Sequence, residues 1–406
     1  MGYRQRLFMR TFDWTLFVST LLILAFGILV LSSAGRTTGG AADYHTRQLV
    51  WAAIGVAAML LALFLPFRTL DVLAIPVYGA VLVSLLYLIL TSSSGAGRWI
   101  GLGPFRFQPS EAAKIALVLM MARVLSDHPP GRSGLQGWLI PAVVAGIPFL
   151  LVLRQPDLGS SLVFGAILVP MLFWAGLPER AILFAISPAI GLVASAHLPT
   201  WIAFLVVLFV VLVAMRSSLL FLGATLGMNM LVGIAGPILW NQLEDYQQLR
   251  ILTFLDPNHD PLGAGYQIIQ SEVAIGSGGF TGKGFLQGTQ KGLSFLPEQH
   301  TDFVFSVVGE EFGYLGCALL LTLFAVLLGR MLLIAARTRN RFASLIVIGF
   351  FGYLAFQVVV NVGMTLGLVP VTGLPLPLMS YGGSSLVTTL FAIGVVLGVG
   401  LRHRRY

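Results

Sequence analysis

The sequence predicts an all-α polytopic membrane protein, a bundle of about 12 transmembrane helices. Of its 406 residues, 57% are hydrophobic and only 10% are charged. A water-soluble domain of this length could not bury so much apolar surface, and long uncharged stretches recur along the whole chain. The first stretch, residues 14–33, is too long for a signal-peptide core and is expected to remain as a span.

Apolar runs of helical length mark the individual spans. A helix rises about 1.5 Å per residue, so the short runs at 181–196 and 200–215 barely cross a hydrocarbon core of about 30 Å. One run between 181 and 238 is therefore a candidate re-entrant segment. The predicted spans are residues 14–34, 48–66, 70–91, 109–126, 138–153, 158–176, 181–196, 200–215, 217–238, 303–332, 342–368 and 384–401.

Arginine residues between the apolar runs predict the orientation in the membrane. They precede the first span, follow the last and fall in alternate short loops, and those that decide the orientation are Arg4, Arg6, Arg10, Arg68, Arg132, Arg180, Arg216, Arg337, Arg339, Arg341, Arg402, Arg404 and Arg405. The positive-inside rule then places both termini in the cytoplasm. The net charge of +8 is thus explained by membrane topology, and no nucleic-acid partner is expected.

Two longer loops fall on the opposite, outer side, at 92–111 and 240–302. Nine of the 16 acidic residues lie between Glu244 and Glu311. Loops this long in a compact protein are usually functional or disordered. Apolar residues from Tyr266 to Ile275 favour a short amphipathic helix lying in the membrane surface. We expect one integral membrane domain, residues 1–406, with 240–302 as its large extracytoplasmic loop.

Some kinds of chemistry are excluded or disfavoured. The single cysteine, Cys317, allows neither an internal disulfide nor a cysteine metal cluster. The segment GSGGFTGKG, residues 276–284, superficially resembles a phosphate-binding loop, but no Ser or Thr follows its Gly-Lys pair and no strand precedes it. A flexible glycine hinge is the expected role. The outer side also lacks ATP and nucleotide sugars, so a reaction there needs a ready-activated substrate such as a polyprenyl-linked sugar.

The segment LPEQHTDFVFSVVGEE, residues 296–311, contains the strongest catalytic candidate. Asp302 stands at the membrane–water boundary where an apolar run begins, next to His300. A carboxylate held there could take a proton from a sugar hydroxyl as a general base. The alternative is that Thr301 or Asp302 caps a helix starting at Phe303, a preference worth about 1 kcal/mol. Spacing alone favours the cap.

Two more carboxylates follow deeper in the same run. Ionisable groups inside a membrane are costly, and they usually have a functional role or a partner on a facing helix. Glu310 is predicted to share a broad helix face with Asp302, whereas Glu311 points well away. For Glu311 we expect a structural ion pair rather than catalysis.

A second group of polar residues surrounds the fourth predicted span. Its members Arg98, Arg106 and Lys114 are cations on the side that is otherwise poor in them, and such a set could bind a lipid diphosphate. Trp99 and Glu111 belong to the same candidate substrate site. Glu111 and Lys114 are three residues apart, so an ion pair on one helix face is the structural alternative.

Two further outer segments contribute candidate substrate-binding residues. RQPDLGSS, residues 154–161, adds Arg154 and Asp157, although Asp157 could simply cap the sixth span. In PVTGLPLPLMSYGGSSL, residues 370–386, the residues Gly382, Gly383, Ser384 and Ser385 lie at a helix start, where free N–H groups favour anions. Ser380 and Ser384 are the substrate-binding candidates of this segment. A capped turn explains this second segment equally well.

Five segments together resemble the SEDS family of bacterial cell-envelope proteins, and most closely its elongation-type members. They are spread over nearly the whole chain and read GRWIGLGPFRFQPSEAAK, RQPDLGSS, QLRILTFLDPNHDPLGAGYQIIQSEVAIGSGGFTGKGFLQGTQ, LPEQHTDFVFSVVGEEFGYLG and GLPLPLMSYGGSS. The resemblance implies a peptidoglycan glycosyltransferase of the bacterial cytoplasmic membrane that polymerises lipid II during cell elongation. It also implies two partners, a class B penicillin-binding protein and the rod-shape elongation complex.

The resemblance assigns roles to particular residues. The family's essential carboxylate corresponds to Asp302, its outer-loop tryptophan to Trp99 and a lysine on the next helix to Lys114. The family usually has ten spans, so this chain departs from it by an apparent extra pair between 180 and 238.

The implied reaction is attack of an acceptor sugar hydroxyl on the anomeric carbon of a second lipid-linked sugar, with undecaprenyl diphosphate leaving. Asp302 would be the base. Positive charge for the diphosphate would come from Arg98, Arg106, Lys114, Arg154 or a bound divalent cation, Mg or Mn. The alternatives are a lipid II flippase, which the absence of an inverted repeat disfavours, and a membrane scaffold that docks a partner enzyme.

Overall fold

The described part of the chain is almost entirely helical. The computed structural model describes residues 12–34, 42–91, 97–102, 105–130, 136–195, 197–240, 248–249, 252–254, 256, 264–288 and 300–402. Its main helices are α2 (Trp14–Ala34), α3 (Ala42–Phe64), α4 (Phe67–Thr91), α5 (Pro109–Asp127), α6 (Gln136–Leu153), α7 (Leu158–Trp174), α8 (Glu179–Ala194), α9 (Leu198–Ala214), α10 (Leu219–Trp240), α12 (Ala264–Gly278), α14 (Val304–Arg337), α15 (Arg341–Thr365) and α16 (Gly383–Arg402). One short antiparallel hairpin joins β1 (Ile100–Leu102) to β2 (Phe105–Phe107).

The helical membrane fold is confirmed. A helix occupies each of the 12 ranges in which the sequence predicts a span. Within the described residues, seven helices are long and apolar enough to cross a membrane, namely α2, α3, α4, α10, α14, α15 and α16. Helices α6, α7 and α9 are apolar but shorter, so the number of spans stays a prediction. The β1–β2 pairing between α4 and α5 was not predicted from the sequence.

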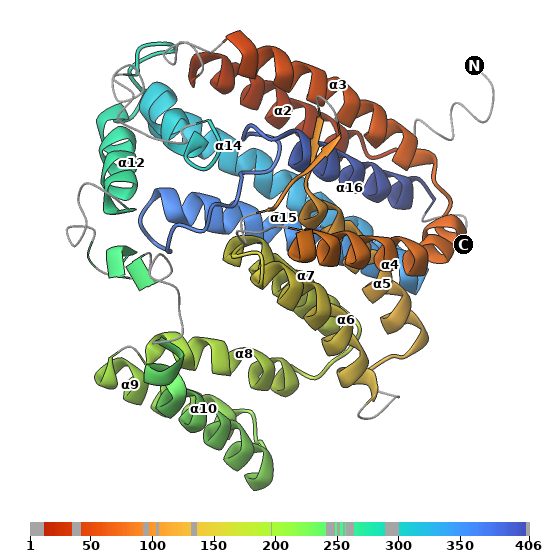
Figure 1. The fold of residues 1–406 in the computed structure, drawn as a ribbon, viewed down its shortest axis with the longest axis vertical. Helices are drawn as coiled ribbons and strands as arrows, with labels where there is room; N and C mark the ends of the chain where they lie inside the picture. The colour runs from red at the N-terminus through yellow and green to blue at the C-terminus, as the bar shows by residue number, and fades with distance from the viewer. Residues whose placement is uncertain are drawn as a thin grey trace.

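The centre of the bundle is formed by α14, α15 and α16, with α2 and α3 along one side and α4 to α7 on another (Figure 1). In α15, 78% of the residues in its apolar stretch are buried, against 17% in α4. Because of this high buried share, α15 is an inner helix, enclosed by protein rather than by lipid.

Helices α3 and α16 approach closely at Gly394, where an added Cβ would lie 2.2 Å from the Met59 carbonyl oxygen.

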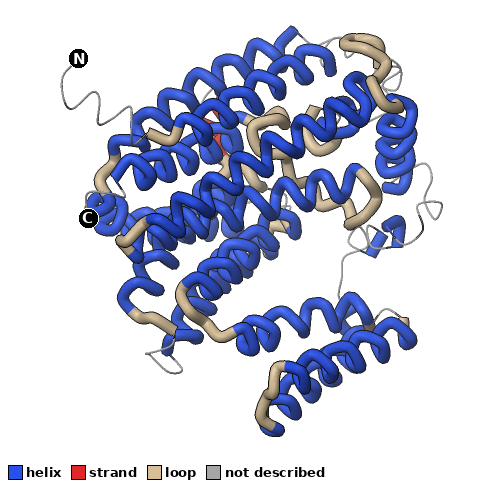
Figure 2. Tube along the Cα trace, turned by 180° about the vertical axis from the view of Figure 1, so that it is seen from behind, coloured by secondary structure: helices blue, strands red, loops and turns tan. Residues whose placement is uncertain are grey.

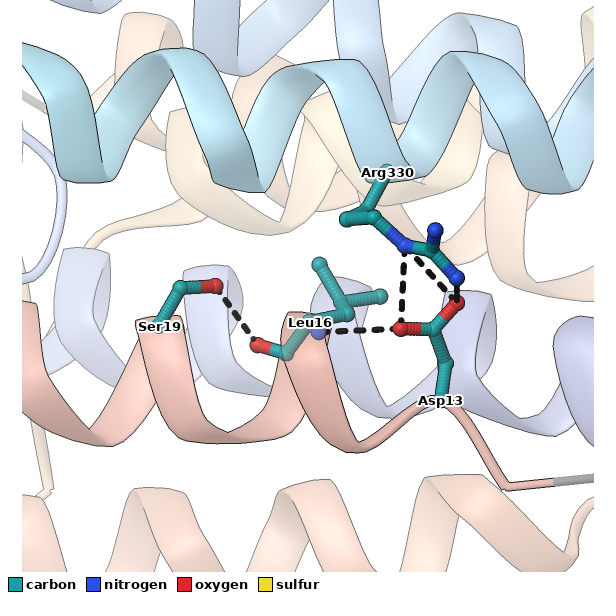
Figure 3. A network of polar contacts seen from close by, with 4 residues as sticks. All are labelled: Asp13, Leu16, Ser19 and Arg330. Atoms are coloured by element: carbon teal, nitrogen blue, oxygen red, sulfur yellow. Dashed lines mark hydrogen bonds and ion pairs between the residues drawn. The ribbon is translucent and has the colours of Figure 1, made fainter. Parts of the chain in front are cut away.

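An ion pair ties the first helix to α14 (Figure 3). Asp13 precedes α2 and accepts a hydrogen bond from the Leu16 backbone N–H at 3.0 Å, as an N-cap does. The same carboxylate receives the guanidinium of Arg330, with Nη2 2.6 Å from Oδ2. Since Arg330 lies near the C-terminal end of α14, this contact places the start of α2 at the opposite end of α14 from Asp302.

Helix α14 is broken at Gly313, where φ is +63° and ψ is −160°. The segment 276–284 docks onto the break and supplies the missing backbone hydrogen bonds. These run from Lys283 N to Glu310 O, Gly284 N to Glu311 O, Tyr314 N to Gly279 O, and Leu315 N to Phe280 O. A Cβ on Gly282 would lie 2.1 Å from the Glu311 carbonyl oxygen. The expectation of a flexible glycine hinge is therefore wrong, because these glycines permit close backbone packing.

Helices α8, α9 and α10 form a small unit beside the main bundle, joined to it at α7 (Figures 1 and 2). This is the region in which the sequence predicts an extra pair of spans. Asn229 of α10, fully buried, donates hydrogen bonds to the Ser187 hydroxyl and to the Thr225 carbonyl oxygen, both at 2.9 Å. A cavity of about 760 Å³ lies where this unit meets the end of α7, and none of its lining residues is a predicted site residue.

Candidate active site

The turn that contains Asp302 meets the end of α15 and the segment 366–382, both of which are far from it in the sequence. This turn leads into α14, and the segment 366–382 connects α15 to α16. The Tyr381 backbone N–H donates to the His300 carbonyl oxygen at 2.8 Å. Asn361 of α15 donates to the carbonyl oxygens of Asp302, at 2.9 Å, and Leu374, at 2.8 Å. The Tyr381 backbone N–H and the Asn361 amide thus hold the turn and the connecting segment together, by donating to backbone carbonyl oxygens.

Asp302 lies just outside α14 and is partly exposed, whereas the adjacent Phe303 is fully buried. The helix begins at Val304, and its N-cap position is Phe303, whose side chain makes no capping hydrogen bond. The helix therefore starts one residue later than the capping alternative assumed. Asp302 lies in the turn that precedes it, at the end of the bundle.

The backbone of Gly373 packs beside the Asp302 carboxylate. Gly373 has φ +72°, which a residue with a side chain rarely adopts. A Cβ placed there would lie 3.5 Å from Asp302 Oδ2, in van der Waals contact with the carboxylate. The Gly373 backbone is therefore an immediate neighbour of the Asp302 side chain.

An aromatic cluster borders the same turn. The ring of Tyr44, near the start of α3, lies 4.8 Å from the ring of His300 and 5.1 Å from that of Tyr381. Ser380 is buried, and its hydroxyl accepts a hydrogen bond from the Leu376 backbone N–H at 2.8 Å. Ser380 thus closes a turn within the segment that connects α15 to α16. Ser384 lies in the first turn of α16 and is partly exposed.

Residues of the α6–α7 connection approach the same region. Asp157 is the N-cap of α7 and accepts from the Ser160 backbone N–H at 3.1 Å, which confirms the capping alternative. A Cβ on Gly159 would lie 2.4 Å from the Thr372 carbonyl oxygen, so the start of α7 touches the segment next to Gly373. Arg154, in the same connection, is exposed.

Arg98 organises this connection. Its Nε donates to the Gln155 carbonyl oxygen at 3.2 Å, and its Nη2 donates to the Pro156 carbonyl oxygen at 2.6 Å. The neighbouring Trp99 is 47% exposed. Arg106 pairs with Gly101 in the hairpin, but its side chain lies outside the described residues.

Glu111 and Lys114 form the expected ion pair. Lys114 Nζ lies 2.6 Å from Glu111 Oε1, and both side chains are almost completely buried. The ammonium also lies 5.1 Å from the ring centroid of Tyr353 on α15. Sequence reasoning placed this pair at the outer edge of a span, but the structure places it inside the bundle. In this arrangement Lys114 is not exposed to a lipid diphosphate.

The two deeper carboxylates of α14 contact other elements. Glu310 Oε1 pairs with Lys283 Nζ at 2.8 Å, and Glu311 Oε1 accepts from the Ser33 hydroxyl at 2.5 Å. Both residues thus tie α14 to neighbouring segments, Glu310 through an ion pair and Glu311 through a hydrogen bond. Among the described residues, no cluster of three His, Cys, Asp or Glu side chains could hold a metal ion.

The structure thus places the turn with His300 and Asp302 against the segment that contains Ser380. It brings Arg98, Arg154 and Asp157 to the same end through the α6–α7 connection. Sequence reasoning missed Tyr44, Gln48 and Asn361. Gln48 Nε2 donates to the Ser380 carbonyl oxygen at 3.3 Å. The available signal for Asn361 was an amide inside an otherwise apolar run.

The chain matches a known family over nearly its whole length. The model of the family described as "Cell cycle protein", which covers FtsW, RodA and SpoVE, matches residues 13–201 and 181–405. These two matches overlap at residues 181–201, in α8 and the start of α9, in the region of the predicted extra helices.

Named relatives and solved structures agree with this match. Peptidoglycan glycosyltransferase MrdB of Escherichia coli K12 is 38% identical over 401 residues, which cover 97% of this chain and 94% of MrdB. Peptidoglycan glycosyltransferase RodA of Treponema pallidum is 34% identical over 425 residues, covering 97% and 98%.

Among solved structures, one that addresses the structural coordination of polymerization and crosslinking by a peptidoglycan synthase complex gives a TM-score of 0.72 at 36% identity. It covers 97% of this chain and 98% of the matched one. RodA of Thermus thermophilus gives 0.64 at 31% identity, covering 97% of each chain. With its apolar helices and bacterial relatives, the chain is a bacterial multi-pass membrane protein. It belongs to the FtsW/RodA/SpoVE family, the SEDS proteins.

Proposed function

We propose that this chain is a peptidoglycan glycosyltransferase that polymerises lipid II into glycan strands during cell elongation. Relatives that match it over nearly its full length, at 34–38% identity, carry the name peptidoglycan glycosyltransferase. The observation that supports the catalytic assignment is a partly exposed carboxylate, Asp302, beside the bare backbone of Gly373.

Asp302 is the proposed general base. It accepts the proton of the acceptor sugar hydroxyl, whose oxygen forms a bond to the anomeric carbon of the donor. The bond from that carbon to the diphosphate oxygen breaks at the same time, and undecaprenyl diphosphate leaves. A general base must come within about 2.6–3.2 Å of the oxygen it deprotonates, so the carboxylate needs an open approach.

The departing diphosphate requires positive charge. Arg154 is the proposed direct contact, because its side chain is exposed in the α6–α7 connection. Arg98 supports it by holding two carbonyl oxygens of that connection, and Lys114 balances Glu111 inside the bundle. A divalent cation on the diphosphate, Mg or Mn, is the alternative source of charge.

The active site is proposed to face the periplasm, with both termini in the cytoplasm. Helix α14 runs from the Asp302 turn to Arg337. The arginine-rich connection at 337–341 lies at the end opposite Asp302, and the positive-inside rule assigns that end to the cytoplasm.

A class B penicillin-binding protein and the rod-shape elongation complex are the proposed partners. The most relevant comparison is the solved structure described as a peptidoglycan synthase complex that coordinates polymerization with crosslinking.

Purified chain supplied with lipid II tests the function. The wild type should form glycan ladders, and Asp302→Asn should form none while retaining its folding and its lipid II binding. Asp71→Asn is the matched control, since Asp71 is not among the residues around Asp302. Its Oδ1 lies 3.6 Å from Arg123 Nη1, with which it forms an ion pair. Transbilayer movement of lipid II in liposomes without polymer would favour the flippase instead.

A further inference from the structure

We propose that Asn361 is a positioning residue that fixes the Asp302 carboxylate and the backbone facing it in one geometry. This inference rests on the proposed role of Asp302 as the base. It extends that role by naming the group that determines where the base stands.

Asn361 uses both of its N–H donors on two different chain segments. Its side chain is fully buried on α15, and its Nδ2 lies 2.9 Å from the Asp302 carbonyl oxygen and 2.8 Å from the Leu374 carbonyl oxygen. A primary amide nitrogen has two hydrogens, so these bonds exhaust it. The amide therefore bridges the catalytic turn and the α15–α16 connection.

The element that carries Asn361 is held firmly. The Thr365 carbonyl oxygen, one turn further along α15, accepts from the Ser271 hydroxyl at 2.6 Å. Ser271 also shares a 2.6 Å hydrogen bond with Ser306 on α14. The end of α15 is thus bonded to α12, which is in turn bonded to α14. Asn361 therefore attaches the catalytic turn to a helix that is itself mostly enclosed by protein.

The two hydrogen bonds of Asn361 fix both the Asp302 turn and the backbone that faces the Asp302 carboxylate. Asp302 lies in a turn rather than in a helix, so the regular α14 hydrogen bonds do not hold it. Leu374 is buried and directly follows Gly373, the residue whose backbone lies beside Asp302 Oδ2. Losing the amide would release the base and its facing backbone together. A displacement of about 1 Å in a reacting group costs about 100-fold in rate.

Asn361 itself is fully buried, so it is not expected to touch the substrate. Its loss should therefore lower turnover and leave substrate affinity nearly unchanged. A purely structural role would instead lower the amount of folded protein and leave the turnover of each folded molecule intact.

The experiment compares Asn361→Leu with Asn229→Leu in the full-length protein, using lipid II as substrate. Asn229 is the matched control, because it is equally buried and also donates two hydrogen bonds, but within the α8–α10 unit. We expect kcat to fall about 100-fold in Asn361→Leu, with KM changed less than about threefold. In Asn229→Leu, kcat should stay near the wild-type value.

Asp302→Asn, measured in parallel, separates the two claims. If it is inactive while Asn361→Leu keeps wild-type kcat, the positioning role is overturned and the base assignment stands. If Asp302→Asn still polymerises, the base assignment itself fails. An equal loss of kcat in Asn229→Leu would also overturn the positioning role. Should Asn361→Leu not fold, Asn361→Gln displaces the same donors by one methylene, and wild-type kcat in that variant would overturn the proposal.

Discussion

Breaking the Glu111–Lys114 pair tests whether Lys114 mainly balances a buried charge. In Lys114→Met the Glu111 carboxylate would lose an ammonium 2.6 Å away while remaining almost completely buried. Removing one partner of a buried ion pair typically destabilises a protein by about 3–5 kcal/mol. The lost contact between the ammonium and the Tyr353 ring adds about 0.5–2 kcal/mol.

The double variant Glu111→Leu with Lys114→Met isolates the electrostatic part. Replacing a whole buried pair by apolar side chains is often neutral or stabilising. In addition, Glu111 Oε2 has no hydrogen-bond partner within the described structure, so the native pair is incompletely satisfied. We expect the double variant to unfold within about 1–2 kcal/mol of the wild type, since the contact with Tyr353 is still lost.

The assay is reversible unfolding in mixed micelles, followed by circular dichroism for the wild type, both single variants and the double variant. The charge-balance account is refuted if Lys114→Met alone is as stable as the wild type, or if the double variant is as unstable as that single variant. A stable double variant that no longer polymerises lipid II would instead show that Lys114 has a role in the reaction as well.

Three further predictions each concern one contact described above. Gly282→Ala should destabilise the protein strongly, because φ is +80° and the added Cβ would meet the Glu311 carbonyl oxygen, whereas Gly79→Ala, with open space around it, should be neutral in the same thermal unfolding assay. Arg330→Met should lower stability by about 1.5–3 kcal/mol, since the charge-assisted hydrogen bonds to Asp13 are lost, and an unchanged unfolding midpoint would contradict the pairing. Arg98→Lys should reduce kcat for lipid II polymerisation, because an ammonium cannot reproduce the two-pronged contact with the α6–α7 connection, and full activity would show that this contact is dispensable.

The helices and their order could be predicted because each depends on a local apolar run. The helix break at Gly313 could not, since the hydrogen bonds that compensate for it come from residues about 30 positions earlier in the chain. The same applies to the segment 276–284, which looks like a hinge until the contact of Gly282 with the Glu311 carbonyl oxygen is seen. Local patterns do not reveal which distant backbone a glycine must accommodate.

The site residues that stand in a recognisable local pattern could be predicted, whereas contacts with distant segments could not. Asp302 stands out because a charge next to an apolar run is costly, and Asp157 and the Glu111–Lys114 pair follow from short-range spacing. The depth of that pair could not be read from the sequence, because α5 is surrounded by protein instead of lying at an edge. Asn361 was overlooked because its role depends on two carbonyl oxygens contributed by other segments.

The most direct test of the central claim is glycan polymerisation by purified Asp302→Asn at saturating lipid II. The account predicts that this variant folds and binds lipid II as the wild type does, yet produces no glycan polymer above background. Polymer formation at a rate comparable to that of the wild type would contradict the claim that this carboxylate removes the acceptor proton.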